Sequence, residues 1–174
     1  MKKESHELAQ TGARKREWDL VKKVARDLHA AGIQGLTRDR MWAGPHEAPM
    51  GLVVGSEDTM QLLPFTQANK DHALKQLRAM VREKNAGGLV VLYRAALAAL
   101  EEGASKSQFF DTVAVVVEGG PRFHGRGFVM AQAVEWKDGV ITLLSDPHEQ
   151  DYDEHSEEED GGVRQWFDAV GGTA

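Results

Sequence analysis

Apolar runs with strand character dominate the second half of the chain. Residues 111–118, 127–136 and 140–144 are rich in β-branched and aromatic side chains, and turn-forming residues separate them. Three such runs in succession predict an antiparallel meander. Two shorter runs, 51–54 and 59–63, flank a turn-rich loop and predict a further hairpin.

Two other stretches carry apolar residues at helical spacing. Residues 14–31 predict an amphipathic helix that ends at Gly32, and the polar residues 1–12 before it are expected to be loose. Residues 67–85 predict a second helix, with Thr66 as its N-cap. The apolar positions of the two helices are Trp18, Val21, Val24, Ala25, Leu28 and Ala31, followed by Ala73, Leu74, Leu77, Met80 and Val81.

A continuous apolar run that begins at Leu89 has no clear period. Its first residues are typical of a buried strand, whereas 95–102 are strong helix formers. We expect a strand to about Arg94, followed by a short helix that ends at Gly103. One helix across the whole run is the main alternative, because periodicity alone does not separate the two.

These elements predict an α+β fold. The length of 174 residues fits a single domain, which we place at residues 1–145. We expect a mostly antiparallel sheet of about five or six strands, with the two amphipathic helices packed on it. Within 127–136 apolar side chains alternate onto both faces, so both faces of the sheet should be covered.

Charge is segregated along the chain. The net charge is −6, but residues 1–45 contain ten Lys or Arg against six acids, whereas residues 146–174 contain ten acids and one Arg. This composition predicts that 146–174 is an acidic tether that does not order itself over 146–160. Segregated charge of this kind indicates an interaction segment, or an acidic tail that folds over a basic patch.

The tether ends in an aromatic segment, 163–170. Trp166 and Phe167 are adjacent there, and large aromatic side chains rarely stay fully exposed in a monomer. One interpretation is a docking peptide on an acidic arm, and the other is a last short helix packed on the sheet.

A basic surface is predicted on the first helix. Its members lie off the apolar stripe and should face outward: Arg16, Lys22, Lys23 and Arg26. The ordinary interpretation is a solvated helix face, and the functional one is a contact surface for a protein partner, a second copy or the acidic tail. The acidic total and the few interleaved aromatics argue against nucleic acid.

The loop 119–127 is the densest polar cluster. Four glycines there would let backbone amides approach a ligand, while Arg122 and Arg126 supply charge and His124 can move a proton. Together they could hold a phosphate or carboxylate. A strand follows the loop and no Gly-Lys-Ser/Thr occurs, so neither a dinucleotide fingerprint nor a P-loop is present. A solvated hairpin loop is the alternative.

Several function classes lose support from composition. Cysteine is absent, which removes disulfides, thiolate catalysis and Cys-ligated metals and fits a reducing compartment. No stretch has the roughly 18 apolar residues of a membrane span, and the first residues do not resemble a signal peptide. Acids and histidines of the tail do not match a calcium loop. We therefore expect a cytoplasmic protein with no membrane association, no cofactor and no metal site.

The predicted function is a non-catalytic binding or adaptor module. It would engage a protein partner, or itself, through its charged ends and the aromatic segment. A protein that binds a small anion or nucleotide at 119–127 is the first alternative. A phosphoester hydrolase with His124 as acid or base is the second, and it lacks any convergent nucleophile and base.

Overall fold

The computed structural model describes residues 2–35, 50–55, 60–64, 69–99, 108–137 and 140–153. The structure does not describe Thr66, residues 154–160, Trp166 or Phe167, so what was predicted for them stays a prediction. The described elements, in chain order, are α1 Lys2–Gln34, β1 Met50–Val54, β2 Met60–Pro64, α2 Lys70–Glu83, β3 Gly88–Ala99, β4 Gln108–Gly119, the 3₁₀ turn η3 Pro121–Phe123, β5 Gly127–Lys137, β6 Val140–Leu143 and β7 His148–Tyr152.

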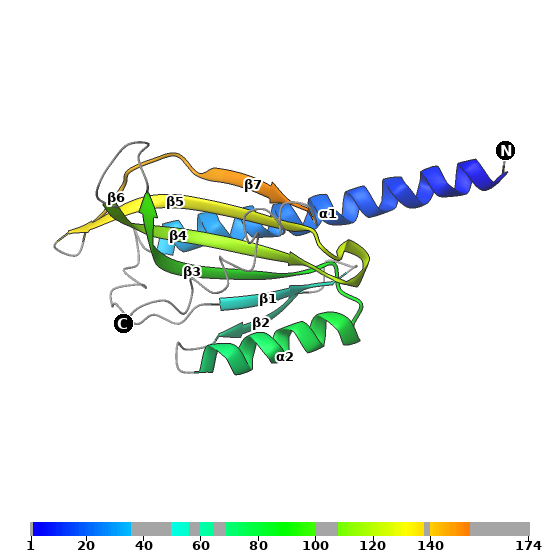
Figure 1. Cartoon of the computed structure of the whole chain (residues 1–174), viewed down its shortest axis with the longest axis horizontal. Coiled ribbons are helices and arrows are strands. Elements are labelled where there is room, and N and C mark those ends of the chain that lie inside the picture. Colours follow the sequence, from blue (N-terminus) through cyan, green and yellow to red (C-terminus); the bar gives the residue numbers. More distant parts are fainter. Residues whose placement is uncertain are drawn as a thin grey trace.

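The strands form one antiparallel sheet in the order β2-β1-β3-β4-β5-β6, and β7 also pairs with β5 (Figure 1). The predicted hairpin of β1 and β2 and the predicted meander of β4, β5 and β6 are both confirmed. The α+β class is confirmed with them. In the described part of the chain, no helix is long and apolar enough to cross a membrane.

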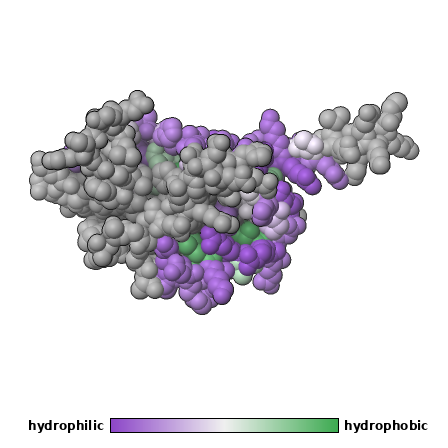
Figure 2. All heavy atoms as spheres, in the orientation of Figure 1, coloured by the Kyte–Doolittle hydropathy of each residue, from purple (hydrophilic) through white to green (hydrophobic). Residues whose placement is uncertain are grey.

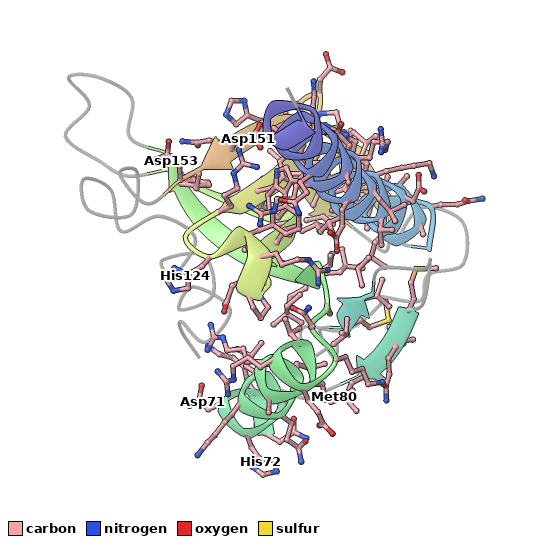
Figure 3. All side chains as sticks on the ribbon, turned by 90° about the vertical axis from the view of Figure 1, so that its right-hand side faces the viewer. Asp71, His72, Met80, His124, Asp151 and Asp153 are labelled. Carbon is pink, nitrogen blue, oxygen red and sulfur yellow. The ribbon has the colours of Figure 1, made fainter. Side chains whose placement is uncertain are left out.

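The two helices cover opposite faces of the sheet (Figure 3). α1 packs on β3, β4 and β5 through Trp18, Val21 and Ala25, all nearly inaccessible to solvent. α2 packs on β1 and β3 through Leu74 and Leu77. Phe128 and Val134 belong to the α1 face and Val129 to the α2 face, so the prediction that both faces are covered is confirmed. Hydrophilic residues cover the visible outer surface of α2 (Figure 2).

The prediction for α1 was too short. Residues 2–12, expected to be loose, are helical, and these turns extend past the end of the sheet (Figure 1). Gly32 does not end the helix. A Cβ at Gly32 would lie 3.0 Å from Leu92 Cδ2, so the glycine allows close packing against β3. The apolar stripe is also rotated, because Ala31 is exposed while His29 is buried.

β3 is a single twelve-residue strand, and both interpretations of its second half were wrong. Residues 95–99, predicted to be helical, pair with residues 108–112 of β4. Every residue of β3 has a partner on β4, from Gly88 opposite Gly119 to Ala99 opposite Gln108. Cross-strand pairing at the centre of the sheet therefore overrides the helix propensity of the alanines.

The acidic stretch also differs from its prediction. His148–Tyr152, expected to be part of a disordered tether, forms β7 and pairs with residues 127–131 of β5. The sheet thus continues past residue 145. Tyr152 is the one buried residue of this strand and belongs to the hydrophobic cluster on the α2 face, whereas the other four residues are exposed. Backbone pairing, the burial of Tyr152 and the ion pairs to α1 together hold the strand.

Candidate functional site

β7 is fastened to α1 by two ion pairs. Arg26 donates to Glu149 through two nitrogens, at 2.7 and 2.9 Å, and Lys22 Nζ lies 3.1 and 3.4 Å from the two Asp151 oxygens. Both cations also lie over the ring of Phe128 on β5, at 5.3 and 5.5 Å from its centroid. Two members of the predicted basic surface, Lys22 and Arg26, therefore meet the acidic stretch within the chain.

The Arg26 pair shifts both partners in the favourable direction. The hydrogen bond to Arg26 lowers the pKa of Glu149, and the hydrogen bond from Glu149 raises the pKa of Arg26. A carboxylate with a lowered pKa in the folded state stabilises the fold above its ordinary pKa. That contribution is lost as the pH falls through the lowered value.

We expect Glu149→Gln combined with Asp151→Asn to loosen β7 without unfolding the core. The substitutions keep the shape of both side chains but remove the charges that hold this exposed strand. Amide exchange at 148–152 should accelerate at least several-fold, while exchange in β4 stays unchanged. Asp27→Asn, which breaks the exposed Lys23–Asp27 pair at 2.7 Å, is the control. Unchanged exchange in β7 would show that the ion pairs are not needed to hold the strand.

The loop 119–127 is built for close packing. Gly119 N–H donates to the carbonyl of Arg126 and Gly120 N–H to the carbonyl of Gly87, both at 2.9 Å. Phe123 N–H donates to Gly120 O at 2.8 Å, and Arg126 N–H to Phe123 O at 2.9 Å. These four amides are committed within the protein, so they do not form the backbone cradle that the glycine content predicted. The charged side chains of the loop remain candidates for binding a ligand.

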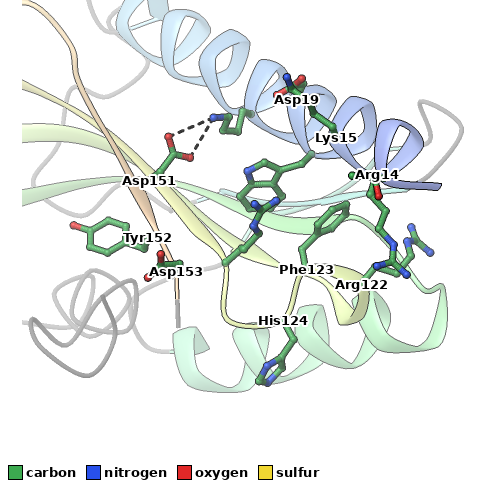
Figure 4. Close-up of a pocket in the computed structure, with 13 residues that line it drawn as sticks. Arg14, Lys15, Asp19, Arg122, Phe123, His124, Asp151, Tyr152 and Asp153 are labelled. Carbon is green, nitrogen blue, oxygen red and sulfur yellow. Dashed lines mark hydrogen bonds and ion pairs between the residues drawn. The ribbon is translucent and has the colours of Figure 1, made fainter. Parts of the chain in front are cut away.

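Those side chains have separate environments. Arg122 forms an ion pair with Glu17 of α1: Nε lies 3.2 Å from Oε2, and Nη2 contacts Oε1. Arg126 is exposed, and its guanidinium lies over the ring of Trp18, 5.9 Å from the centroid. His124 points away from α1, toward the α2 side of the loop (Figures 3 and 4). All three predicted ligand-binding residues nevertheless line one groove.

A groove runs between α1, the loop and the end of β7 (Figure 4), and its volume is about 940 Å³. Its floor is Trp18, which is 6% exposed and packs against Phe123 with ring centroids 5.3 Å apart. Basic residues line it from α1 and the loop, and acidic residues line it from α1 and the end of β7: Arg14, Lys15, Lys22, Arg122 and Arg126, with Asp19, Asp151 and Asp153.

The five basic residues of the groove fall into two groups. Lys22 and Arg122 are neutralised by carboxylates of the chain itself. Arg14, Lys15 and Arg126 form no ion pair with any residue that the structure describes. We call these three residues the free cation triad.

Sequence reasoning identified Arg126 but not Arg14 or Lys15. Charge alone gives no reason to choose them among the basic residues of α1. The loop lies beside the first half of α1 because it joins the end of β4 to the start of β5. The sequence pattern does not show which turns of α1 the loop faces. Arg16 and Lys23, predicted for the same surface, are exposed and do not line the groove.

Comparison with known proteins gives no match, since no family model, curated protein or solved structure is similar to this chain. Among the described residues, no group of three or more His, Asp or Glu is placed to hold a metal ion. The candidate site therefore depends on its own geometry.

Proposed function

We propose that the protein is a non-catalytic binding module that receives an acidic segment of a protein partner in the groove beside α1. The free cation triad carries the proposal. The other two basic residues of the groove, Lys22 and Arg122, are compensated by carboxylates of the chain, whereas the triad forms no ion pair with a described residue and so offers a place for an external anion.

An extended acidic segment fits better than a small anion. The groove is open, and four of the loop amides that could cradle a phosphate already have partners within the protein. Asp19, Asp151 and Asp153 line the same groove and would repel a uniformly charged polymer such as nucleic acid. A peptide can place its carboxylates on the triad and neutral residues beside the acids. Hydrolysis with His124 has less support: His124 lines the groove, but no serine or cysteine is among the described residues that line it.

Replacing Arg14, Lys15 and Arg126 together with alanine should abolish most of the binding. Hydrogen bonds to charged groups contribute about 1.5–3 kcal/mol each, so a loss of at least about 10- to 100-fold in affinity is expected. The probe is a fluorescein-labelled peptide in which glutamates alternate with neutral residues, titrated at low salt by fluorescence anisotropy. The same peptide with glutamine in place of glutamate is the ligand control.

Arg16→Ala is the matched protein control. It removes one positive charge from the same helix but lies outside the groove, so it should change affinity less than two-fold. Equal weakening by Arg16→Ala would indicate a diffuse basic surface instead of a groove. ATP and inorganic phosphate at millimolar concentration test the small-anion alternative, which predicts that they compete with the peptide. Location in the cytoplasm remains part of the proposal, based on the absence of cysteine.

A further inference from the structure

β7 is joined to the sheet independently of β6. Both strands pair with the same side of β5. From Val134 to Ala131 the chain of β5 takes three steps, whereas the strand edge opposite takes five, from Leu143 to His148. The edge therefore carries two extra residues, which form a bulge between β6 and β7. Because the bulge interrupts the ladder, β7 can separate from β5 while β6 keeps its pairing.

Ser145 closes the β6 side of this bulge. Its hydroxyl accepts the Ala133 N–H at 3.2 Å, and its carbonyl accepts Gln132 Nε2 at 2.8 Å. Leu144 N–H donates to the carbonyl of Ala133 at 2.9 Å. These hydrogen bonds anchor the edge beside residues 132–133 without β7. Departure of β7 would therefore uncover the stretch 127–131 of β5.

The place that β7 occupies selects a recognisable pattern. Arg26 and Lys22 of α1 receive Glu149 and Asp151, two acids that lie two residues apart on one face of the strand. Tyr152 enters the hydrophobic cluster on the opposite face. The backbone of β5 pairs with any extended chain. A strand with an acid, a spacer, an acid and an aromatic residue in this order would make the same contacts.

β7 itself fills this place mostly through exposed contacts. The side chain of Asp151 is 62% exposed and that of Glu149 is 38% exposed. Exposed ion pairs are individually weak, and segments with few buried contacts open at a lower free energy than the core. β7 is therefore the strand of this sheet edge that a competitor can replace.

The place of β7 continues directly into the groove (Figure 4). Residues 151–153 line the groove together with Lys22. Along α1, Arg26 and Arg14 are about 18 Å apart, a length that five to six extended residues cover at about 3.3 Å each. One extended segment can therefore contact Arg26, Lys22 and the free cation triad together. A partner that does so gains ion pairs with the triad beyond those that β7 makes with α1.

We infer that the acidic segment of the partner binds as a strand on β5, in the place of β7, and continues into the groove. The inference rests on the proposed function and adds the bound conformation and the sequence pattern of the partner. In this arrangement β7 is a built-in substitute. It covers the edge of β5 while the partner is absent, because an open edge pairs readily with other chains.

Locking β7 to β5 tests the inference. Ala131 and His148 lie directly opposite each other, and neither is among the described residues that line the groove. Ala131→Cys combined with His148→Cys can therefore form a disulfide across the pair. The chain has no cysteine of its own, so this bond is the only possible one, and oxidation of the unmodified protein is the control. The oxidised variant should bind the alternating glutamate peptide about ten-fold or more weakly than its reduced form, because the locked protein has no open state.

Equal affinity of the oxidised and reduced variant would overturn the inference and leave the proposed function standing, since the peptide would then bind with β7 in place. The proposed function fails separately if alanine at the free cation triad leaves the affinity of the protein unchanged.

The second test needs no substitution. With saturating peptide, amide exchange at 148–152 should accelerate at least several-fold, while amides of β5 at 127–131 stay protected because the peptide pairs with them. The peptide with glutamine in place of glutamate should change neither stretch. Unchanged exchange at 148–152 with the glutamate peptide would overturn the inference. Accelerated exchange in both stretches would overturn it as well, because β7 would then be released without a replacement.

Discussion

Gly120→Ala should destabilise the protein by more than about 3 kcal/mol, as expected for forced overlap in a packed interior. A Cβ at Gly120 would lie 2.0 Å from the carbonyl oxygen of Ala86, which is backbone and has no rotamer to escape into. The φ of −71° is ordinary, so the requirement for glycine comes from this approach alone. Chemical denaturation followed by circular dichroism measures the loss.

Gly12→Ala is the control with the opposite sign. The added Cβ would meet only Arg16 Nη1 at 3.9 Å, and alanine is favoured over glycine inside a helix by about 0.5–1 kcal/mol. We expect a gain of that size. A Gly120→Ala protein as stable as the unmodified one would mean that the loop and the α2–β3 turn separate easily. The positions of Arg122 and Arg126 would then be loosely determined.

Acid should destabilise the fold through His29. Its side chain is 2% exposed between α1 and the sheet, and Nε2 has no hydrogen-bond partner among the described residues. Burial lowers the pKa of His29, and a hydrogen bond to the backbone of Val113 offsets this only in part. The unfolded chain therefore binds the proton more tightly than the folded one.

The sign follows from that difference. Above about pH 6.5 the histidine is neutral in both states and contributes no pH dependence. Below that value the unfolded state gains protons first, so stability falls by at most about 1.4 kcal/mol per pH unit until the lowered pKa is reached. We expect a loss of about 1–2 kcal/mol between pH 7.5 and pH 5.

His29→Leu should flatten this pH dependence, because the buried titrating group is gone. Urea denaturation at pH 7.5, 6 and 5 gives the free energy of unfolding for each protein. His72→Gln, at an exposed position on α2, removes a histidine without removing the buried one and should leave the pH dependence intact. A His29→Leu protein that loses as much stability in acid as the unmodified one would exclude His29 as the cause.

Local patterns were sufficient for most of the sheet. Alternation in 127–136 predicted that both faces of the sheet are covered, and the hairpin of β1 and β2 followed from short β-branched runs around a turn. Patterns failed where long-range pairing decides conformation. Residues 95–99 have helical propensity yet pair with β4, and nothing in their own sequence indicates this pairing.

The candidate site was predicted only in part, for the same reason. The charge pattern indicated that acidic and basic ends would meet, and Lys22 and Arg26 do meet Asp151 and Glu149. Composition alone predicted that this acidic stretch would be disordered. That prediction was wrong because the residues that stabilise the stretch are more than a hundred positions away in the sequence, where a local pattern does not show them. Arg14 and Lys15 are candidate binding residues only because they line the groove that the loop and the helix form together.

The two edges of the sheet differ in whether a further strand could pair with them. β6 and β7 occupy the outer side of β5, whereas no strand among the described residues pairs with the outer side of β2. β2 has no charged residue, and Met60 and Leu62 are more than half exposed. Uncharged apolar edges favour strand addition. Two copies joined there would share one continuous sheet and leave both grooves, at the opposite edge, accessible to their ligands.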